Sequence, residues 1–157
     1  MRILVISDSH GRINNIEKAI EAHPSVQHIF FLGDCVNDLE NLRFIYDEKI
    51  FHTVSGNCDH SSFERCSDMI ELGGLRIFYT HGHLYSVKSG MERLREAATS
   101  CGADLVLYGH THIAKTEYDG GVYYVNPGSI GMGRSNGESY AVIDIEHNGI
   151  MPVIIKL

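Results

Sequence analysis

The chain has 157 residues, of which 43% are hydrophobic and 21% are charged, and these values predict one globular domain over residues 1–157. The formal net charge of −7 argues against a protein that coats nucleic acid or an anionic membrane through bulk charge. The four cysteines form no C-x-x-C pair, and the N-terminal apolar run is too short for a signal peptide or a membrane span. We therefore expect a cytoplasmic protein with reduced thiols.

The first half of the chain alternates between strands and helices. Continuous apolar runs predict buried strands at 2–6, 26–32 and 50–54. Apolar residues spaced three and four apart predict a helix from 12 to 22, and a shorter amphipathic segment follows around 39–45. Strand, helix and strand in this order imply a parallel unit with a right-handed crossover.

The second half is dominated by predicted hairpins. A helix is expected to begin near Ser89, where Glu92 completes a capping box, and to end at Gly102. A strand at 104–108 follows it. The hairpins pair 69–72 with 75–80 across Gly73-Gly74, 113–118 with 122–125 across Asp119-Gly120-Gly121, and 139–145 with 150–156 across Asn148-Gly149. The pattern predicts an α/β fold in which sheet packs on sheet and helices lie outside.

Polar residues suited to metal binding follow five of the predicted strands. They are Asp8 and His10, then Asp34, Asn57 and His81, then His110 with His112. Taken singly, each fits a turn or a helix cap, but ligands of open α/β sheets gather outside the carboxyl ends of strands, so these positions can converge. Seven ligands exceed the needs of one tetrahedral ion and suit two ions that share a carboxylate. The mixture of oxygen and nitrogen donors favours Mn, Fe, Zn, Ni or Co over Ca or Mg.

Taken in order, these motifs resemble those of the calcineurin-like metallophosphoesterases. The matching stretches are Asp8-x-His10, Gly33-Asp34, Gly56-Asn57, His81-Gly82 and Gly109-His110-x-His112. The short chain, Gly56-Asn57-Cys58-Asp59 and Asn126-Pro127-Gly128-Ser129 are most similar to the small prokaryotic phosphodiesterases, to which the retromer small subunit is related. The resemblance implies a four-layer sandwich of two mixed sheets flanked by helices. It also implies that Asp8, His10 and His112 hold a first metal, that Asn57, His81 and His110 hold a second, and that Asp34 bridges both.

The resemblance implies an enzyme that hydrolyses a small phosphodiester, with attack by a hydroxide that bridges two divalent ions. Mn is the first expectation for the metal, with Ni, Fe, Zn or Co as alternatives. Loss of Asp34 or Asn57 is expected to abolish catalysis. Two alternatives stay open: a phosphomonoesterase or nucleotide hydrolase on the same site, and a non-catalytic metal-binding scaffold. We expect no membrane partner, and a homo-oligomer stays open.

Two positions depart from the family pattern. Many relatives carry Asp three residues after the bridging Asp, and His directly after the ligand Asn, whereas this chain has Asn37 and Cys58 there. Because that His protonates the leaving group, its loss predicts a preference for leaving groups of low pKa. Cys58 and His83 are candidates for contacting substrate or supporting the ligands, with a space-filling thiol and a solvated imidazole as the alternatives. Arg134 is either a phosphate partner or a surface arginine.

Overall fold

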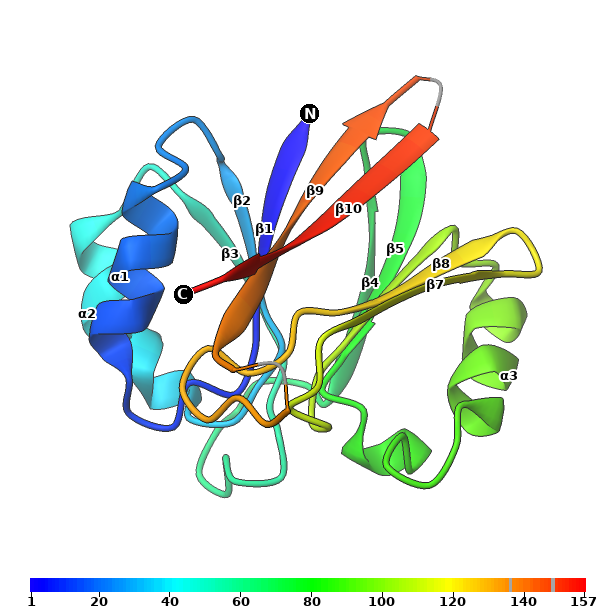
Figure 1. Cartoon of the computed structure of the whole chain (residues 1–157), viewed down its shortest axis with the longest axis horizontal. Helices are drawn as coiled ribbons and strands as arrows, with labels where there is room; N and C mark the ends of the chain where they lie inside the picture. Colours follow the sequence, from blue (N-terminus) through cyan, green and yellow to red (C-terminus); the bar gives the residue numbers. More distant parts are fainter. Residues whose placement is uncertain (136, 148) are drawn as a thin grey trace.

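The computed structural model describes residues 1–135, 137–147 and 149–157, and it has two five-stranded sheets packed face to face (Figure 1). The first sheet has the order β10-β9-β1-β2-β3, and the second has the order β4-β5-β6-β8-β7. Helices cover the outer face of each sheet, so the predicted sandwich of mixed sheets is confirmed. The strands of the first sheet are β1 (Arg2–Ile6), β2 (His28–Phe31), β3 (Ile50–Thr53), β9 (Ser139–Glu146) and β10 (Gly149–Lys156).

The first sheet contains the predicted parallel unit. Strands β1, β2 and β3 run parallel, whereas β9 pairs antiparallel with β1, and β10 pairs antiparallel with β9. Helix α1 (Ile13–Glu21) connects β1 to β2 and buries Ile16, Ala19 and Ile20 against the sheet. The 3₁₀-helix η1 (Val36–Leu39) and helix α2 (Glu40–Ile45) lie between β2 and β3.

The second sheet contains a parallel trio, β5-β6-β8, with an antiparallel strand on each side. Helix α3 (Glu92–Cys101) covers its outer face through Leu94 and Ala98, and the 3₁₀-helix η2 (His83–Tyr85) precedes α3. Strand β8 lies between β6 and β7, so the predicted hairpin is also the parallel neighbour of β6. The strands are β4 (Ser67–Leu72), β5 (Leu75–Thr80), β6 (Leu105–Tyr108), β7 (Lys115–Asp119) and β8 (Val122–Asn126).

Strand β1 is buried on both faces, which explains its unbroken apolar sequence. Ile3 and Val5 belong to the layer between the two sheets, and Leu4 and Ile6 pack on the side of α1. Full burial of each such side chain stabilises the fold by about 1.5–3 kcal/mol. The carboxyl end of β1 is therefore held firmly between the two sheets.

The capping box predicted at Ser89 is wrong. Helix α3 begins at Glu92 after Met91, with no side-chain capping hydrogen bond. Ser89 instead donates its backbone N–H to Ser86 O (2.8 Å), within a turn that continues from η2. The predicted C-cap is confirmed, since Gly102 has a φ of 64°. At the last predicted hairpin, Asn148 lies outside the described residues, whereas β9 and β10 pair antiparallel as expected.

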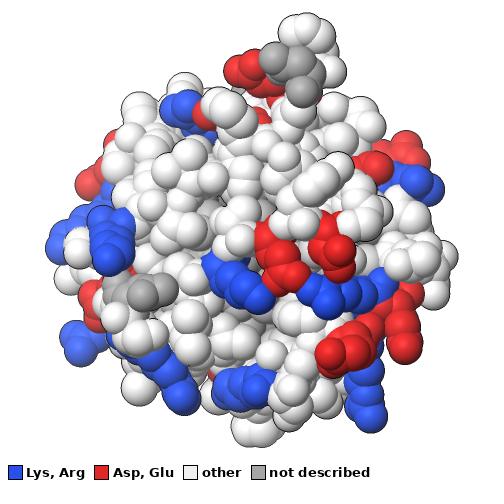
Figure 2. Space-filling model, turned by 45° about the vertical axis from the view of Figure 1, so that its right-hand side comes forward, with Lys and Arg blue, Asp and Glu red and all other residues white. Residues whose placement is uncertain are grey.

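The surface carries charges of both signs. On the face shown in Figure 2, basic and acidic side chains lie beside one another and do not form one basic field. None of the helices in the described ranges is long and apolar enough to cross a membrane.

Candidate metal centre

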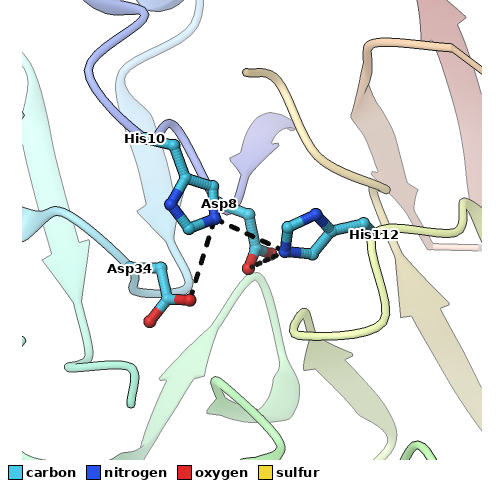
Figure 3. Close-up of side chains that lie close together, drawn as sticks. All are labelled: Asp8, His10, Asp34 and His112. Atoms are coloured by element: carbon cyan, nitrogen blue, oxygen red, sulfur yellow. Dashed lines mark hydrogen bonds and ion pairs between the residues drawn. The ribbon is translucent and has the colours of Figure 1, made fainter. Parts of the chain in front are cut away.

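The seven predicted ligand positions all follow strands and meet where the carboxyl ends of both sheets come together. Asp8 and His10 follow β1, Asp34 follows β2, Asn57 follows β3, His81 follows β5, and His110 and His112 follow β6. Within this set, Asp8, His10, Asp34 and His112 each offer one donor atom, and these atoms lie within 4.8 Å of one another (Figure 3). The positions that the sequence separates by up to about a hundred residues thus form one cluster.

His10 and His112 face each other across the first part of the cluster. Their Nε2 atoms lie 3.4 Å apart. His112 Nε2 also lies 3.1 Å from Asp8 Oδ1, and His10 Nε2 lies 3.9 Å from Asp34 Oδ2. The two imidazoles and two carboxylates therefore surround a common point.

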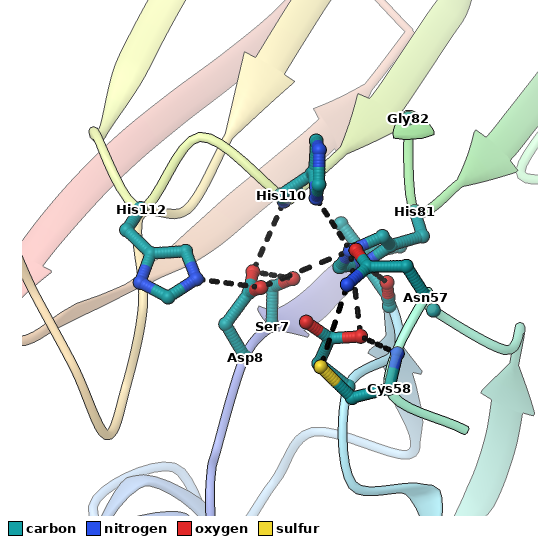
Figure 4. Close-up of polar contacts among 12 residues, drawn as sticks. Ser7, Asp8, Asn57, Cys58, His81, Gly82, His110 and His112 are labelled. Atoms are coloured by element: carbon teal, nitrogen blue, oxygen red, sulfur yellow. Dashed lines mark hydrogen bonds and ion pairs between the residues drawn. The ribbon is translucent and has the colours of Figure 1, made fainter. Parts of the chain in front are cut away.

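His81 is the centre of the second part of the cluster. Its Nε2 lies 3.1 Å from both Asn57 Oδ1 and His110 Nδ1, and these side chains point toward one another in Figure 4. Asp34 Oδ1 lies 3.6 Å from the same nitrogen. Since its other oxygen faces His10, Asp34 adjoins both parts of the cluster.

Backbone carbonyls set the orientation of two of these rings. His81 Nδ1 donates to Leu32 O (2.7 Å), and His112 Nδ1 donates to Met132 O (2.9 Å). In the neutral ring, Nε2 then carries the lone pair and points into the cluster. The lone pair of His81 faces the oxygens of Asn57 and Asp34, which is an unfavourable arrangement of acceptors that a cation between them would relieve.

The carboxylate of Asp8 also indicates a site for a cation. Its side chain is fully buried, and its Oδ1 has no hydrogen-bond donor among the residues that the structure describes. Its Oδ2 accepts hydrogen bonds from Ser7 Oγ and from the backbone N–H of His110 (3.1 Å). A buried carboxylate oxygen without a partner is costly. The oxygen and nitrogen donors of this cluster therefore fit divalent cations.

The charges of the cluster agree with this fit. Burial opposes ionisation of Asp8, but the neighbouring imidazoles of His112 and His81, together with the Ser7 hydroxyl, outweigh burial and lower the pKa of Asp8. Burial is the main cause that lowers the pKa of His110 to about 4, so this ring is neutral near pH 7. The cluster thus presents a carboxylate and a neutral imidazole, the forms in which these side chains bind metals.

The backbone of the cluster is strained. Five of the seven positions, Asp8, His10, Asp34, His110 and His112, have φ angles between 45° and 68°. Among the other described residues, only Cys35 and Ser86 share this left-handed conformation without being glycine. Such residues cost about 1–3 kcal/mol each and persist where the surrounding fold over-determines them. The sharp turns aim side chains at a common point that regular strands would miss.

Two glycines permit the close approach of these turns. A Cβ at Gly109 would collide with Ser7 and with the carboxylate of Asp8, and a Cβ at Gly56 would collide with the carboxylate of Asp34. Both positions therefore require glycine for space. In the sequence motifs, Gly109 directly precedes His110 and Gly56 directly precedes Asn57.

Asp59 is a supporting residue that the sequence analysis did not single out. Its Oδ2 accepts the backbone N–H groups of Asp34 (2.8 Å) and Gly56 (2.7 Å), and its Oδ1 accepts that of Val36 (2.8 Å). The backbone N–H of Cys58 in turn donates to Asp34 Oδ1 (2.9 Å). Asp59 thus joins the loop that carries Asp34 to the loop that carries Asn57.

Asp38 and Ser129 hold the loop after β1. Asp38 Oδ2 accepts hydrogen bonds from Ser9 Oγ (2.6 Å) and from the backbone N–H of Gly11 (2.8 Å), and Ser129 Oγ donates to Asp8 O (2.7 Å). The only sequence signal for Ser129 was its place in the turn Asn126-Pro127-Gly128-Ser129. Asp38 lies one residue after the position at which many relatives carry Asp, and the sequence pattern did not assign it that role.

Cys58 and His83 both lie beside the cluster. The Cys58 thiol accepts a hydrogen bond from Asn57 Nδ2 (3.4 Å), and its pKa is raised to about 11 by partial desolvation and then by Asp34. The His83 ring lies 5.3 Å from the ring of His81, and its Nδ1 is buried with no partner in the described part of the chain. Asn37 shares a surface pocket with Cys58. The roles of these side chains stay predictions.

The four-layer fold and the Asp and His side chains at its strand ends define a class, the metal-dependent phosphoesterases. The family model of the calcineurin-like phosphoesterase superfamily domain matches residues 1–148. The chain belongs to this family.

Three similar proteins extend the comparison. The chain is 33% identical over 150 residues to the probable metallophosphoesterase YsnB of Bacillus subtilis, covering 94% of this chain and 86% of YsnB. It is 29% identical over 180 residues to the phosphodiesterase YfcE of Escherichia coli, covering 98% and 91%. The structure of Vps29 from Entamoeba histolytica complexed with zinc superposes with a TM-score of 0.79 at 21% identity, covering 99% and 98%. The expected relation to the metallophosphoesterases is confirmed, and Vps29 shares the fold.

Proposed function

We propose that this metallophosphoesterase hydrolyses a small phosphodiester at a site for two divalent ions. The observation that carries the proposal is the convergence of acceptor atoms: the lone pair of His81 Nε2 faces the oxygens of Asn57 and Asp34, and the buried Oδ1 of Asp8 has no described hydrogen-bond partner. The names of YsnB and YfcE support the choice of reaction.

The residues divide into two ligand sets that share one carboxylate. Asp8, His10 and His112 would hold one ion, and Asn57, His81 and His110 would hold the other. Asp34 would contact both, because its two oxygens face His10 and His81 respectively. When bound, divalent ions polarise phosphoryl oxygens and lower the pKa of the attacking water.

The residues of the chain supply attraction and orientation. Two dications against the carboxylates of Asp8 and Asp34 leave a local charge of about +2, which attracts a phosphate in spite of the acidic chain. The side chains of His10 and His112 keep 18% and 13% exposure, whereas that of His81 is fully buried. Asn57 is exposed as well, so substrate approaches over the ligands that reach the surface and not past His81.

The leaving group receives little help from the protein. Position 58, beside Asn57, carries a thiol in place of an imidazole, and position 37 carries an amide in place of a carboxylate. Departure thus depends on the stability of the leaving alkoxide or phenolate and on the ions themselves. We propose Mn as the working metal, with Ni, Fe, Zn or Co able to occupy the same oxygen and nitrogen ligands.

The test combines metal analysis with a panel of esters. Protein stripped of metal and titrated with Mn²⁺ should bind two ions per chain and should hydrolyse bis(4-nitrophenyl) phosphate faster than 4-nitrophenyl phosphate. Asp34→Ala should remove detectable turnover and lower the metal content, whereas the exposed Asp47→Ala is the matched control and should change neither. Normal turnover by Asp34→Ala would show that the shared-ligand assignment is wrong.

Two other results would select the alternatives. Faster hydrolysis of the monoester, or of nucleotides, would favour a phosphomonoesterase or nucleotide hydrolase on the same ligands. Binding of metal without turnover of any phosphate ester would favour a scaffold, an alternative that the fold shared with Vps29 keeps open.

A further inference from the structure

A pocket of about 400 Å³ lies beside the candidate metal centre. Val87, Met91 and Ile113 contribute apolar surface to its lining, and Lys88 and Arg134 contribute positive charge. Pockets of this size, with mostly apolar walls and a few polar groups, are typical of small-molecule sites.

The pocket shares a wall with the metal centre. Thr111, which also lines the pocket, is the residue between His110 and His112. Val87 packs so closely against Gly82, the residue after His81, that a side chain at Gly82 would meet a Val87 methyl group at 2.9 Å. The pocket therefore adjoins the loops that carry His81, His110 and His112.

Two cations of the pocket are free to meet a ligand. Lys88 and Arg134 are exposed and form no ion pair with any residue in the described ranges. The third cation, Lys115, is different because its Nζ lies 2.6 Å from Glu117 Oε2.

We propose that this pocket receives one ester arm of the substrate, and that this arm has an apolar body and a negatively charged end. The inference rests on the proposed function, because the phosphoryl group held at the metal centre positions the arm. The apolar side chains bury the body of the arm, and Lys88 and Arg134 pair with its terminal anion. The anion is a carboxylate or a second phosphate, since either matches two exposed cations.

The test compares two diesters that share one leaving group. 4-Nitrophenyl phenyl phosphate and 4-nitrophenyl 4-carboxyphenyl phosphate both release 4-nitrophenolate, so they differ only in the arm that is retained. We expect kcat/KM to be about tenfold higher for the carboxylated diester, about threefold for each exposed cation, and mainly through KM. A diester with a phosphate in place of the carboxylate distinguishes the two anions.

Variants locate the preference in the pocket. The double variant Lys88→Met with Arg134→Met should lower the ratio of kcat/KM for the carboxylated diester to that for the uncarboxylated diester from about ten to about one. Arg93→Met, an exposed cation outside this pocket, is the matched control and should keep the preference. Equal kcat/KM for both diesters, or a preference that survives in the double variant, would overturn the inference.

A binding measurement separates this inference from the proposed function. NMR titration of the protein without metal should show larger shifts of the Val87 and Ile113 methyl signals with 4-hydroxybenzoate than with phenol. If the enzyme hydrolyses both diesters equally, the pocket inference fails and the proposed function stands. If it hydrolyses neither diester, the proposed function fails. The titration then tests the pocket by itself. Larger shifts with 4-hydroxybenzoate than with phenol support binding of an apolar body with an anionic end, and equal or absent shifts overturn the pocket inference.

Discussion

Asp59 provides the sharpest test of how the metal centre is held together, because it supports two ligand loops without facing the cluster. Its carboxylate accepts backbone N–H groups from Asp34, Val36 and Gly56 at 2.7–2.8 Å. Asp59→Ala leaves these three donors without their acceptor. We therefore expect a loss of both folding stability and metal affinity.

The magnitude follows from the number of hydrogen bonds and from exposure. A hydrogen bond to a charged acceptor contributes about 1.5–3 kcal/mol. Asp59 is only partly buried, so water replaces it at some of these donors. We expect Asp59→Ala to lower the free energy of unfolding by about 3 kcal/mol in total. Removal of a residue that positions metal ligands typically costs about 10–100-fold in metal affinity.

Urea denaturation of the metal-free variant measures the stability, and titration with Mn²⁺ measures the affinity. Asp59→Asn keeps one acceptor oxygen and should lose about half as much stability. Asp47→Ala, at an exposed position, is the matched control and should stay within about 0.5 kcal/mol of the wild type. A Asp59→Ala protein with wild-type metal affinity would refute the claim that Asp59 holds the two loops in place.

Three further predictions concern strain, pH and chemistry. His112 has a φ of 59°, so His112→Gly should be more stable than His112→Ala by about 1 kcal/mol in urea denaturation, and equal stability would contradict the strain. Burial, followed by His28, lowers the pKa of His52 from 6.5 to about 4; the unfolded chain therefore takes up this proton first as the pH falls. Stability should drop by about 1 kcal/mol between pH 6.5 and 4, allowing for the exposed part of the ring, and His52→Phe should show a smaller drop in pH-dependent urea denaturation. Hydrolysis of aryl phosphodiesters should slow steeply as the pKa of the leaving phenol rises, and Cys58→His with Asn37→Asp should flatten this dependence; a flat wild-type plot would argue for a general acid elsewhere.

Local patterns in the sequence were sufficient for most of the fold. The unbroken apolar run of β1 predicts a strand buried on both faces, and the spacing of Ile16, Ala19 and Ile20 predicts the inner face of α1. Gly102 predicted the end of α3, but Ser89 misplaced its start. The cap failed because residues 86–89 form a turn that depends on η2 packed beside the metal centre, and a four-residue motif carries no information about that neighbour.

The sequence by itself also determined which side chains gather at one edge of each sheet, since polar residues that directly follow parallel strands emerge at the carboxyl ends of those strands. It did not decide that the carboxyl ends of the two sheets meet. Only the tertiary structure decided how they are held. The bonds from Asp59 to Asp34 and from Ser129 to Asp8 join residues 25 and 121 positions apart. The left-handed backbone of Asp8 and His110 persists only because two packed sheets over-determine it. Long-range hydrogen bonds and stored strain arise from the packing of whole elements, and no local pattern of residues encodes them.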